Sequence, residues 1–173
     1  LFPEINILVI EKLSTSGQES TGAFNNAGTG HAANCELNYT PIDNNNLINL
    51  SKALSINNAF EQSLNLWAYL YERNQINIKN FLTFVPHISF VYNDNDVDFL
   101  KRRYDLMKKC REFQDMDFTT SYEEISGWAP LIMKGRDKKQ KIAATILKRG
   151  TDINFEALTK EYIKYLSKKS NIE

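Results

Sequence analysis

The run from Asn25 to His31 places the strongest constraint on what this chain can fold into. It reads Asn-Asn-Ala-Gly-Thr-Gly-His and continues through small and polar residues to Pro41. Because small side chains let a backbone approach another group closely, this run is bare enough to lie against a ligand. Two amides, a threonine and one of the two histidines of the chain stand beside that backbone. The composition predicts a loop built around a ligand, and we expect Ala27–Leu37 to begin a helix whose N-terminus faces it.

A short apolar segment, Ile5–Ile10, precedes this run and ends in Glu11. Its β-branched residues predict a buried parallel strand. An apolar strand that ends in an acid and leads into a glycine-containing segment indicates a dinucleotide-binding half-domain. In such a unit a Gly-x-Gly-x-x-Gly turn and a helix come before the strand that carries the acid. Neither precedes Ile5, so we expect the chain to be a fragment of a longer protein.

The composition excludes several classes of protein. The 173 residues suffice for one domain or for parts of two. Twenty-one basic side chains balance twenty-one acidic ones, which argues against a nucleic-acid partner. No apolar run approaches the roughly 20 residues that cross a bilayer, and no signal peptide is visible. Cys35 and Cys110 are too few for a disulfide framework or a zinc site, so we expect reduced thiols and no metal.

The rest of the chain mixes helical and strand patterns without strict alternation. This order predicts an α/β fold class of the mixed α+β kind, in which a parallel nucleotide-binding layer is interrupted by an inserted α+β layer. The expected elements are one long helix or two over 47–74, strands at 81–85 and 87–92, a helix with its apolar stripe over 97–107, a short strand at 116–118, a brief helix that starts at Ser121 and ends at 128–130, a strand at 142–147, and a last helix capped by Asp152 or Asn154.

Five blocks of the sequence carry a resemblance to a known family. They are Asn25–Pro41, Val85–Val91, Trp128–Leu131, Gly135–Asp137 and Gly150–Phe155. Together and in this order they resemble the malate:quinone oxidoreductases, FAD-dependent enzymes of respiratory metabolism. The departure from the family pattern is the amino-terminal turn, which does not precede Ile5, and we expect the carboxyl-terminal half of the family pattern to be lacking as well.

The resemblance implies a division of the chain and a set of cofactor contacts. Residues 1–45 would form part of a Rossmann-like FAD-binding domain, 46–148 a portion of the substrate domain, and 149–173 a helix that returns to the FAD-binding domain. Glu11 would accept the hydroxyl hydrogens of the adenosine ribose, although a solvated acid is its ordinary role. The backbone of the glycine run would lie on the flavin side of FAD, although a simple glycine turn is the alternative. The residues expected to contact FAD are Glu11, Asn26, Ala27, Gly28, Thr29, Gly30 and His31.

Both histidines are candidate catalytic residues. Oxidation of a 2-hydroxy acid removes a hydride from C2 and a proton from its hydroxyl, and an imidazole suits the proton. The resemblance implies that His31 and His87 face the active-site region, and the choice of base stays open between them. His31 has the alternatives of capping a helix or bonding the flavin, and His87 that of a strand histidine satisfied by the backbone. His87 and Ser89 share one face of a strand, so we expect both to face the substrate.

The carboxylates of malate call for a guanidinium that binds them bidentately. Arg136 lies in a family-like block and is the first candidate for substrate binding, although its charged surroundings are typical of an exposed segment. Arg149 is a weaker candidate. Arg102 and Arg103 are expected to lie on a solvated helix face.

The function implied by the resemblance is oxidation of (S)-malate to oxaloacetate with FAD, followed by transfer of electrons to a quinone. The family implies a peripheral protein on the cytoplasmic face of the inner membrane. Two alternatives stand beside it. One is an FAD-dependent dehydrogenase of another 2-hydroxy acid, and the other is a catalytically inactive folded fragment that self-associates. We expect the chain alone to retain FAD weakly, because the phosphate-binding turn is absent.

Overall fold

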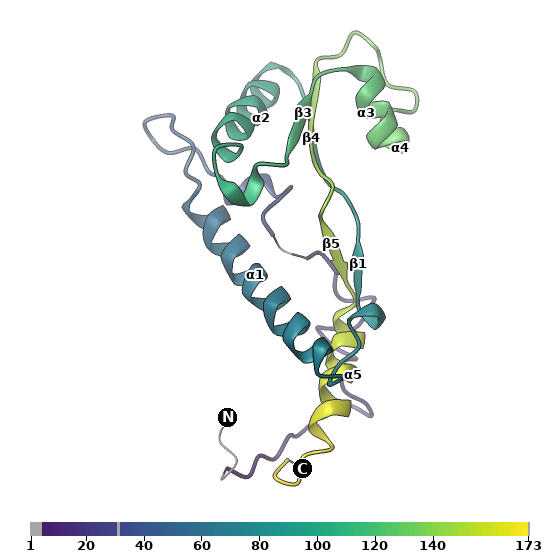
Figure 1. Cartoon of the computed structure of the whole chain (residues 1–173). Helices are drawn as coiled ribbons and strands as arrows, with labels where there is room; N and C mark the ends of the chain where they lie inside the picture. Colours follow the sequence, from purple (N-terminus) through teal and green to yellow (C-terminus); the bar gives the residue numbers. More distant parts are fainter. Residues whose placement is uncertain (1–4, 31, 173) are drawn as a thin grey trace. The chain divides into compact units, whose positions relative to one another are not determined.

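The computed structural model describes residues 5–30 and 32–172, which pack into two compact units. The first unit contains residues 5–30, 62–84 and 151–172, and the second contains 32–61 and 85–150. The helix α1 (Ser51–Glu72) contributes residues to both. Figure 1 labels the helices and strands along the chain.

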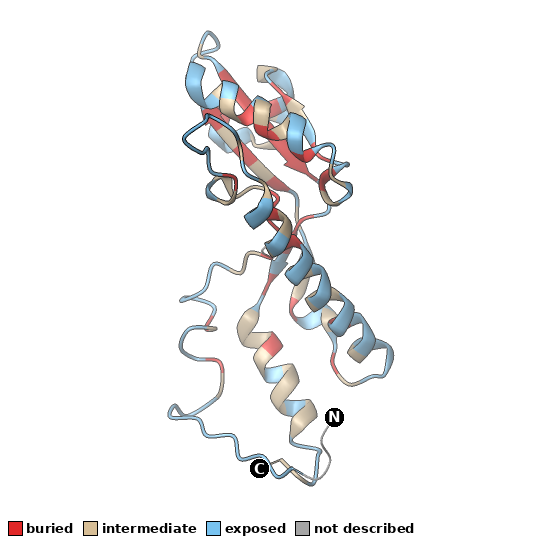
Figure 2. Ribbon diagram, turned by 90° about the vertical axis from the view of Figure 1, so that its left-hand side faces the viewer, coloured by how far each residue is buried: buried red, intermediate tan, exposed pale blue. Residues whose placement is uncertain are grey.

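The second unit is built on a three-stranded antiparallel sheet. Its strands are β2 (His87–Tyr92), β4 (Ile142–Leu147) and β3 (Asp117–Thr119), in the order β2-β4-β3. All six residues of β4 are buried, which agrees with its continuous apolar sequence and its central place. Figure 2 shows the buried residues concentrated in this sheet. The strand β4 is therefore covered on both faces.

Helices cover the two faces of this sheet. The helix α2 (Asp94–Met107) lies on one face, and α3 (Tyr122–Trp128) and α4 (Pro130–Met133) lie on the other (Figure 1). The buried residues on the α2 side are Val91, Leu100 and Ala143, and those on the α3 and α4 side are Ile125, Met133, Ile142 and Ala144. Neighbouring residues of a strand point to opposite faces of the sheet. His87 and Ser89 of β2 therefore lie on the same face as Val91, which is the face that α2 covers.

Side chains cap the starts of the helices α2 and α3. Asn93 accepts a hydrogen bond from the Asp96 amide and starts α2. Ser121 accepts one from the Glu124 amide at the start of α3. Such caps satisfy backbone N–H groups that have no partner within the helix. Short 3-10 helices also occur at Leu37–Tyr39, Ile78–Asn80 and Arg111–Phe113.

The first unit contains a two-stranded antiparallel sheet of β1 (Leu82–Phe84) and β5 (Thr151–Ile153). The helix α5 (Phe155–Leu166) follows β5 and is capped by the Asn154 side chain, as one of the two predicted caps. In its core the indole Nε1 of Trp67 donates to the Tyr162 hydroxyl at 2.7 Å, and the Trp67 and Phe81 rings meet edge to face. Trp67 is thus a core residue.

The mixed α/β fold class is confirmed, and so are the predicted helices and strands between residues 51 and 166. The brief helix α3 ends at Trp128, as predicted, and Pro130 does not continue it. Pro130 begins α4, because proline is favoured in the first turn of a helix. The division into cofactor and substrate portions stays a prediction, since the two units are defined by packing and not by what they bind.

Two expectations near the amino terminus are wrong. Ile5–Ile10 is exposed and forms no strand, and only Ile7 makes an isolated parallel bridge, to Ile172. An apolar run forms a strand only where a neighbouring strand pairs with it, and the sheets of the described residues are antiparallel. The expected helix from Ala27 to Leu37 is absent from the described residues of this range: Thr29 forms an isolated bridge, residues 32–35 form bends, and a short 3-10 helix begins only at Leu37. No helix in the described part of the chain combines the length and apolar character needed to span a membrane.

Replacing Leu100 with alanine is expected to lower the free energy of unfolding by about 2–5 kcal/mol. Leu100 is 0% exposed between α2 and the sheet, so its truncation leaves a cavity. Leu131→Ala is the matched control, because that side chain is 87% exposed and its loss should change stability by less than about 0.5 kcal/mol. Urea unfolding followed by circular dichroism measures both variants. Equal losses would contradict the central place of Leu100 in the core.

Candidate functional site

A loop of the second unit, residues 32–36, is tied to its surroundings by side chains. We call it the tethered loop. The amide Nδ2 of Asn57 donates to the Ala32 carbonyl at 2.9 Å, and the Ser89 hydroxyl donates to the Cys35 carbonyl at 2.8 Å. A loop without regular secondary structure must satisfy its buried backbone groups in this way. The hydroxyl of Ser89, a predicted substrate contact, is therefore engaged with the loop.

Arg103 ties the same loop from α2. Its Nη2 donates to the Ala33 carbonyl at 3.3 Å and to the Asn34 carbonyl at 3.4 Å. Its Nε donates to the Thr40 hydroxyl at 3.0 Å. Ala33 has a φ of 58°, in the left-handed region that is costly for a residue with a Cβ. The guanidinium thus holds a strained part of the backbone.

The expectation that Arg103 lies on a solvated helix face is wrong. The residue is 0% exposed, and its Nη1 has no hydrogen-bond partner among the described residues. Burial lowers the pKa of the guanidinium to about 10, and the charges of Cys35 and Glu36 oppose that shift. The group is therefore charged at pH 7. Leu100 and Met107 lie three and four residues away on the buried stripe of α2, and this spacing is the signal by which the sequence places Arg103 inside.

His87 lies beside the tethered loop. It is 7% exposed, and its Nδ1 is 3.4 Å from Nδ2 of Asn34, which is 4% exposed. A Cβ added to Gly150 would overlap the His87 ring and the Val85 carbonyl. The ring is thus held at one nitrogen by an amide and along one edge by a residue without a side chain. The prediction that His87 and Ser89 share a face of β2 is confirmed.

Arg136 lies on the opposite face of β2. Its guanidinium stacks 4.7 Å from the centroid of the Phe90 ring, and its Nη1 donates to Gln140 at 2.6 Å. Phe90 alternates along the strand with Ser89, so the sheet separates Arg136 from His87. The structure does not bring this predicted carboxylate contact together with the histidine.

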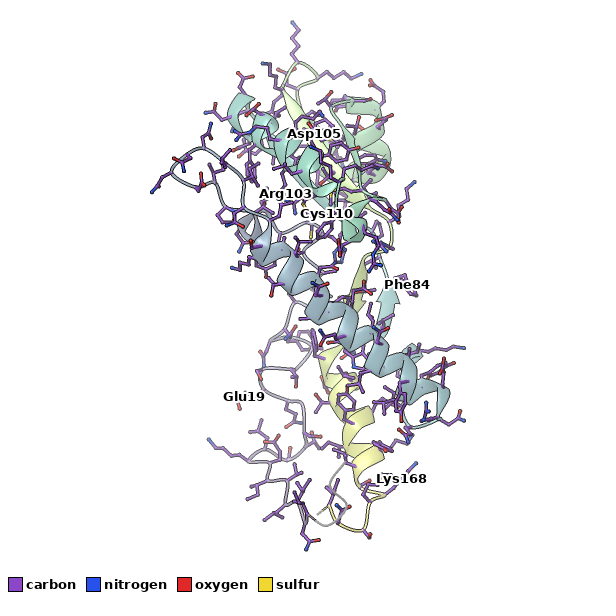
Figure 3. All side chains as sticks on the ribbon, turned by 60° about the vertical axis from the view of Figure 1, so that its left-hand side comes forward. Glu19, Phe84, Arg103, Asp105, Cys110 and Lys168 are labelled. Atoms are coloured by element: carbon purple, nitrogen blue, oxygen red, sulfur yellow. The ribbon has the colours of Figure 1, made fainter. Side chains whose placement is uncertain are left out.

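The remaining arginine candidates are engaged at the surface of the second unit. Arg149 donates to the Glu112 carbonyl and lies 3.9 Å from an Asp115 carboxylate oxygen. Arg102 donates to the Asn46 carbonyl at 2.5 Å and is partly exposed, as expected for a helix face in contact with water. Figure 3 shows these side chains as sticks and labels Arg103 on α2.

In the first unit the glycine run pairs with β5. The Gly30 amide donates to the Thr151 carbonyl at 2.9 Å, and the Ile153 amide donates to the Gly28 carbonyl at 2.5 Å. Thr29 and Asp152 form an antiparallel bridge. The bare backbone therefore lies against another segment of protein over this stretch.

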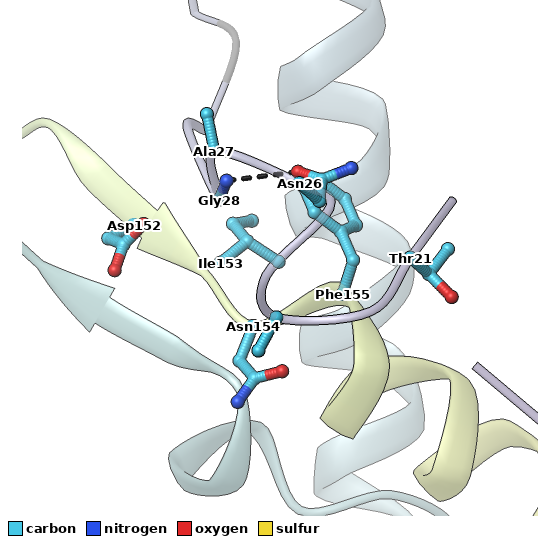
Figure 4. Close-up of a pocket in the computed structure, with 9 residues that line it drawn as sticks. Thr21, Asn26, Ala27, Gly28, Asp152, Ile153, Asn154 and Phe155 are labelled. Atoms are coloured by element: carbon cyan, nitrogen blue, oxygen red, sulfur yellow. Dashed lines mark hydrogen bonds between the residues drawn. The ribbon is translucent and has the colours of Figure 1, made fainter. Parts of the chain in front are cut away.

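The need for glycine at position 28 has a local cause. Gly28 has a φ of 72°, and a Cβ there would lie 2.6 Å from Oδ1 of Asp152 and 3.0 Å from the Ile153 carbonyl. Its amide donates to Oδ1 of Asn26 at 2.9 Å (Figure 4). A cavity of about 180 Å³ lies beside these residues and is also lined by Ala27. The predicted cofactor residues Asn26, Ala27 and Gly28 thus meet at one small cavity.

Glu11 lies elsewhere in the first unit, in an exposed segment. One carboxylate oxygen accepts the Leu13 amide at 2.9 Å. The residue lines a groove of about 540 Å³, otherwise mostly apolar, between residues 9–16 and α5. His31 lies outside the described residues. Among the described residues no cluster of three or more His, Cys, Asp and Glu side chains is placed to hold a metal ion.

Sequence comparison places the chain next to one family. The sequence model of the family described as malate:quinone oxidoreductase matches residues 1–173. A protein of Prochlorococcus marinus strain MIT 9515, named probable malate:quinone oxidoreductase, is 58% identical over all 173 residues, which cover 35% of its length. Proteins with the same name from strains MIT 9312 and NATL1A are 59% and 49% identical over the same residues, again 35% of their length. The chain thus spans about a third of the length of the curated relatives it matches.

Alanine at Gly28 is expected to lower the free energy of unfolding by more than about 1 kcal/mol, because it combines a positive φ with a close contact. Two other glycines separate these causes. Gly135 has a φ of 75° and open space, and Gly127 has open space within the helix α3. Gly135→Ala should cost less than Gly28→Ala, and Gly127→Ala should stabilise the chain by about 0.5–1 kcal/mol. Urea unfolding measures all three, and equal effects at Gly28 and Gly135 would show that Asp152 imposes no steric limit.

Stability is expected to fall between about pH 9 and pH 11 through Cys35. Burial, aided by the charge of Glu36, raises the pKa of this thiol from 9.0 to about 11. In that interval the folded chain keeps a proton that the unfolded chain releases, so rising pH favours unfolding. The expected loss reaches about 2 kcal/mol for this partly exposed group. The measurement is urea unfolding across this pH range, with Cys35→Ser as the variant that lacks the titrating thiol. The interpretation fails if wild type and variant lose stability in parallel.

Proposed function

Because this chain belongs to the malate:quinone oxidoreductase family, we propose that it forms part of an enzyme that oxidises (S)-malate to oxaloacetate and passes electrons to a quinone. The observation that carries the proposal is the buried His87, held between Asn34 and Gly150 in a chain of this family. Since the chain covers 35% of its curated relatives, the activity is proposed for a protein of their length.

We propose FAD as the cofactor. The hydride from C2 of malate would pass to FAD when it is bound, and the chemistry of that step belongs to the cofactor. Some of the residues predicted to contact FAD have groups suited to it, and others do not. Glu11 is an exposed carboxylate at a groove and has oxygen atoms suited to ribose hydroxyls. The amides of Gly28 and Gly30 fit less well, because both already donate within the chain.

Near the glycine run, a cofactor could contact the side chains of Asn26, Ala27 and Thr29 and the small cavity, whereas the amides of Gly28 and Gly30 already donate hydrogen bonds within the chain. Asn26 and Ala27 line that cavity, and Thr29 follows them in the glycine run. We therefore retain Asn26, Ala27, Gly28, Thr29, Gly30 and His31 as proposed cofactor contacts, with Gly28 and Gly30 acting through shape rather than through their N–H groups.

His87 is the residue we propose to hold or move the proton of the C2 hydroxyl. An imidazole has one nitrogen that donates and one that accepts when it is neutral, so it can serve either role. Its burial excludes bulk water from the ring. His31 stays the second candidate for the proton acceptor. Ser89 supports the loop that carries Asn34, and its role in substrate binding is proposed to be indirect.

For the residues that bind the carboxylates of malate, the structure offers less support than it does for His87. Arg136 lies on the face of the sheet away from His87, so its role in binding malate rests on the family-like block alone. By the same resemblance we propose a peripheral location on the cytoplasmic face of the inner membrane. An FAD-dependent dehydrogenase of another 2-hydroxy acid fits the same residues, and activity on a panel of such acids separates the two.

Self-association of the chain as an inactive module stays the remaining alternative. It rests on large apolar side chains that are exposed within the first unit, of which Phe24, Ile10 and Phe84 are the most exposed. Exposed apolar side chains favour self-association where they form a continuous surface.

Replacing His87 with glutamine is expected to lower kcat for malate oxidation by about 10²–10⁴-fold, because an amide neither accepts a proton at neutral pH nor keeps its N–H at the position of the ring nitrogen. The assay is malate-dependent dye reduction in a protein of the relatives' length that carries this sequence. His31→Gln, made in parallel, shows whether the second histidine is also needed, and the flavin absorbance of each preparation reports cofactor loading. Full turnover in both variants would show that neither histidine handles the proton.

A further inference from the structure

The contact between Asn34 and His87 sets a constraint on the imidazole. The atom of Asn34 that faces the ring is the amide nitrogen Nδ2, and it lies 3.4 Å from Nδ1. An amide N–H only donates, so the nitrogen opposite must accept. A neutral imidazole carries one proton, which this contact assigns to Nε2. Both side chains are buried, so water competes little for the contact.

Arg103 holds Asn34 in this orientation. Its Nη2 donates to the carbonyls of Ala33 and Asn34, the two consecutive carbonyls that follow the left-handed Cα of Ala33. Without the guanidinium those buried carbonyls lose their donor, and the strained backbone is free to relax. The side chain of Asn34 starts from this backbone, so its direction depends on Arg103.

Gly150 holds the ring from another side. Its backbone lies so close to Cδ2 and Cγ of His87 that no side chain fits between them. The Val85 amide donates to the Gly150 carbonyl at 3.0 Å and fixes that backbone. The ring therefore has little room to turn over and exchange Nδ1 for Cδ2.

We propose that Asn34 and Arg103 are positioning residues that hold His87 as the tautomer with its proton on Nε2. In that form the ring donates a hydrogen bond from Nε2 to the C2 oxygen of a 2-hydroxy acid, and the hydroxyl proton goes to the second candidate base, His31. This catalytic consequence rests on the proposed function, whereas the tautomer does not.

The tautomer is tested by nitrogen NMR on the 173-residue chain labelled with ¹⁵N-histidine. The chain has two histidines, and His87→Gln identifies the signals of His87. Spectra are recorded at a pH where the wild-type ring is neutral. The expected wild-type result is a protonated Nε2 and an unprotonated Nδ1.

Asn34→Asp is the decisive variant, because a carboxylate has nearly the same shape as the amide and only accepts. We expect it to move the proton of His87 to Nδ1. Arg103→Met should replace the single tautomer with a mixture, whereas Arg102→Met, at the partly exposed neighbouring arginine, should leave the wild-type signals unchanged. Circular dichroism checks that each variant is folded.

A wild-type ring protonated at Nδ1, or an Asn34→Asp variant whose Nδ1 stays unprotonated, overturns the assignment. An Arg103→Met variant that is folded and keeps the single wild-type tautomer removes Arg103 from the proposal. The catalytic part is tested separately in a protein of the relatives' length, where Asn34→Asp should lower kcat at least tenfold and change KM less than twofold. If the proton moves but kcat does not change, the proposed role of His87 in the reaction is wrong and the tautomer assignment stands.

Discussion

The tethered loop of the second unit depends on the buried guanidinium of Arg103, which donates hydrogen bonds to it. Taking a charge out of water costs several kcal/mol, and in the part of the chain that the structure describes no hydrogen-bond partner of Nη1 offsets that cost. The other nitrogens bond three acceptors, the hydroxyl of Thr40 and the carbonyls of Ala33 and Asn34. Charge-assisted bonds are stronger than neutral ones, so a single side chain stabilises a loop that has no secondary structure of its own.

The sheet of the second unit separates this polar cluster from an apolar one. Residues of β2 alternate between the two faces, and the central strand β4 is buried on both. His87 and Ser89 point to the side of the tethered loop, whereas Phe90 meets Arg136 on the side of α3 and α4. A one-residue change of register would exchange these sets, so the apolar residues that fix the register also place the histidine.

Helices and strands with a strong hydrophobic periodicity were predicted correctly from the sequence. The predictions failed where the structure of a residue depends on segments that are distant in the sequence. The stripe of α2 and the alternation of β2 are local patterns, and both were predicted correctly. Ile5–Ile10 has the composition of a strand, but a strand also needs a partner, which no local pattern supplies. Arg103 was assigned to water because it is charged, although its position on the stripe of α2 points inward. The prediction relied on the charge of arginine, whereas the position of Arg103 on the apolar stripe of α2 correctly indicates burial.

The glycine run shows the same limit for function. A bare backbone indicates that something approaches closely, but it does not say what. At Gly28 the approaching group is the Asp152 carboxylate of β5, and the amide of Gly30 is taken by the Thr151 carbonyl. A cofactor next to this strip would therefore meet a surface whose two glycine amides are already satisfied. Its affinity would have to come from shape, from side chains and from charged groups such as Glu11, rather than from the backbone N–H groups that glycine-rich loops usually offer to phosphates.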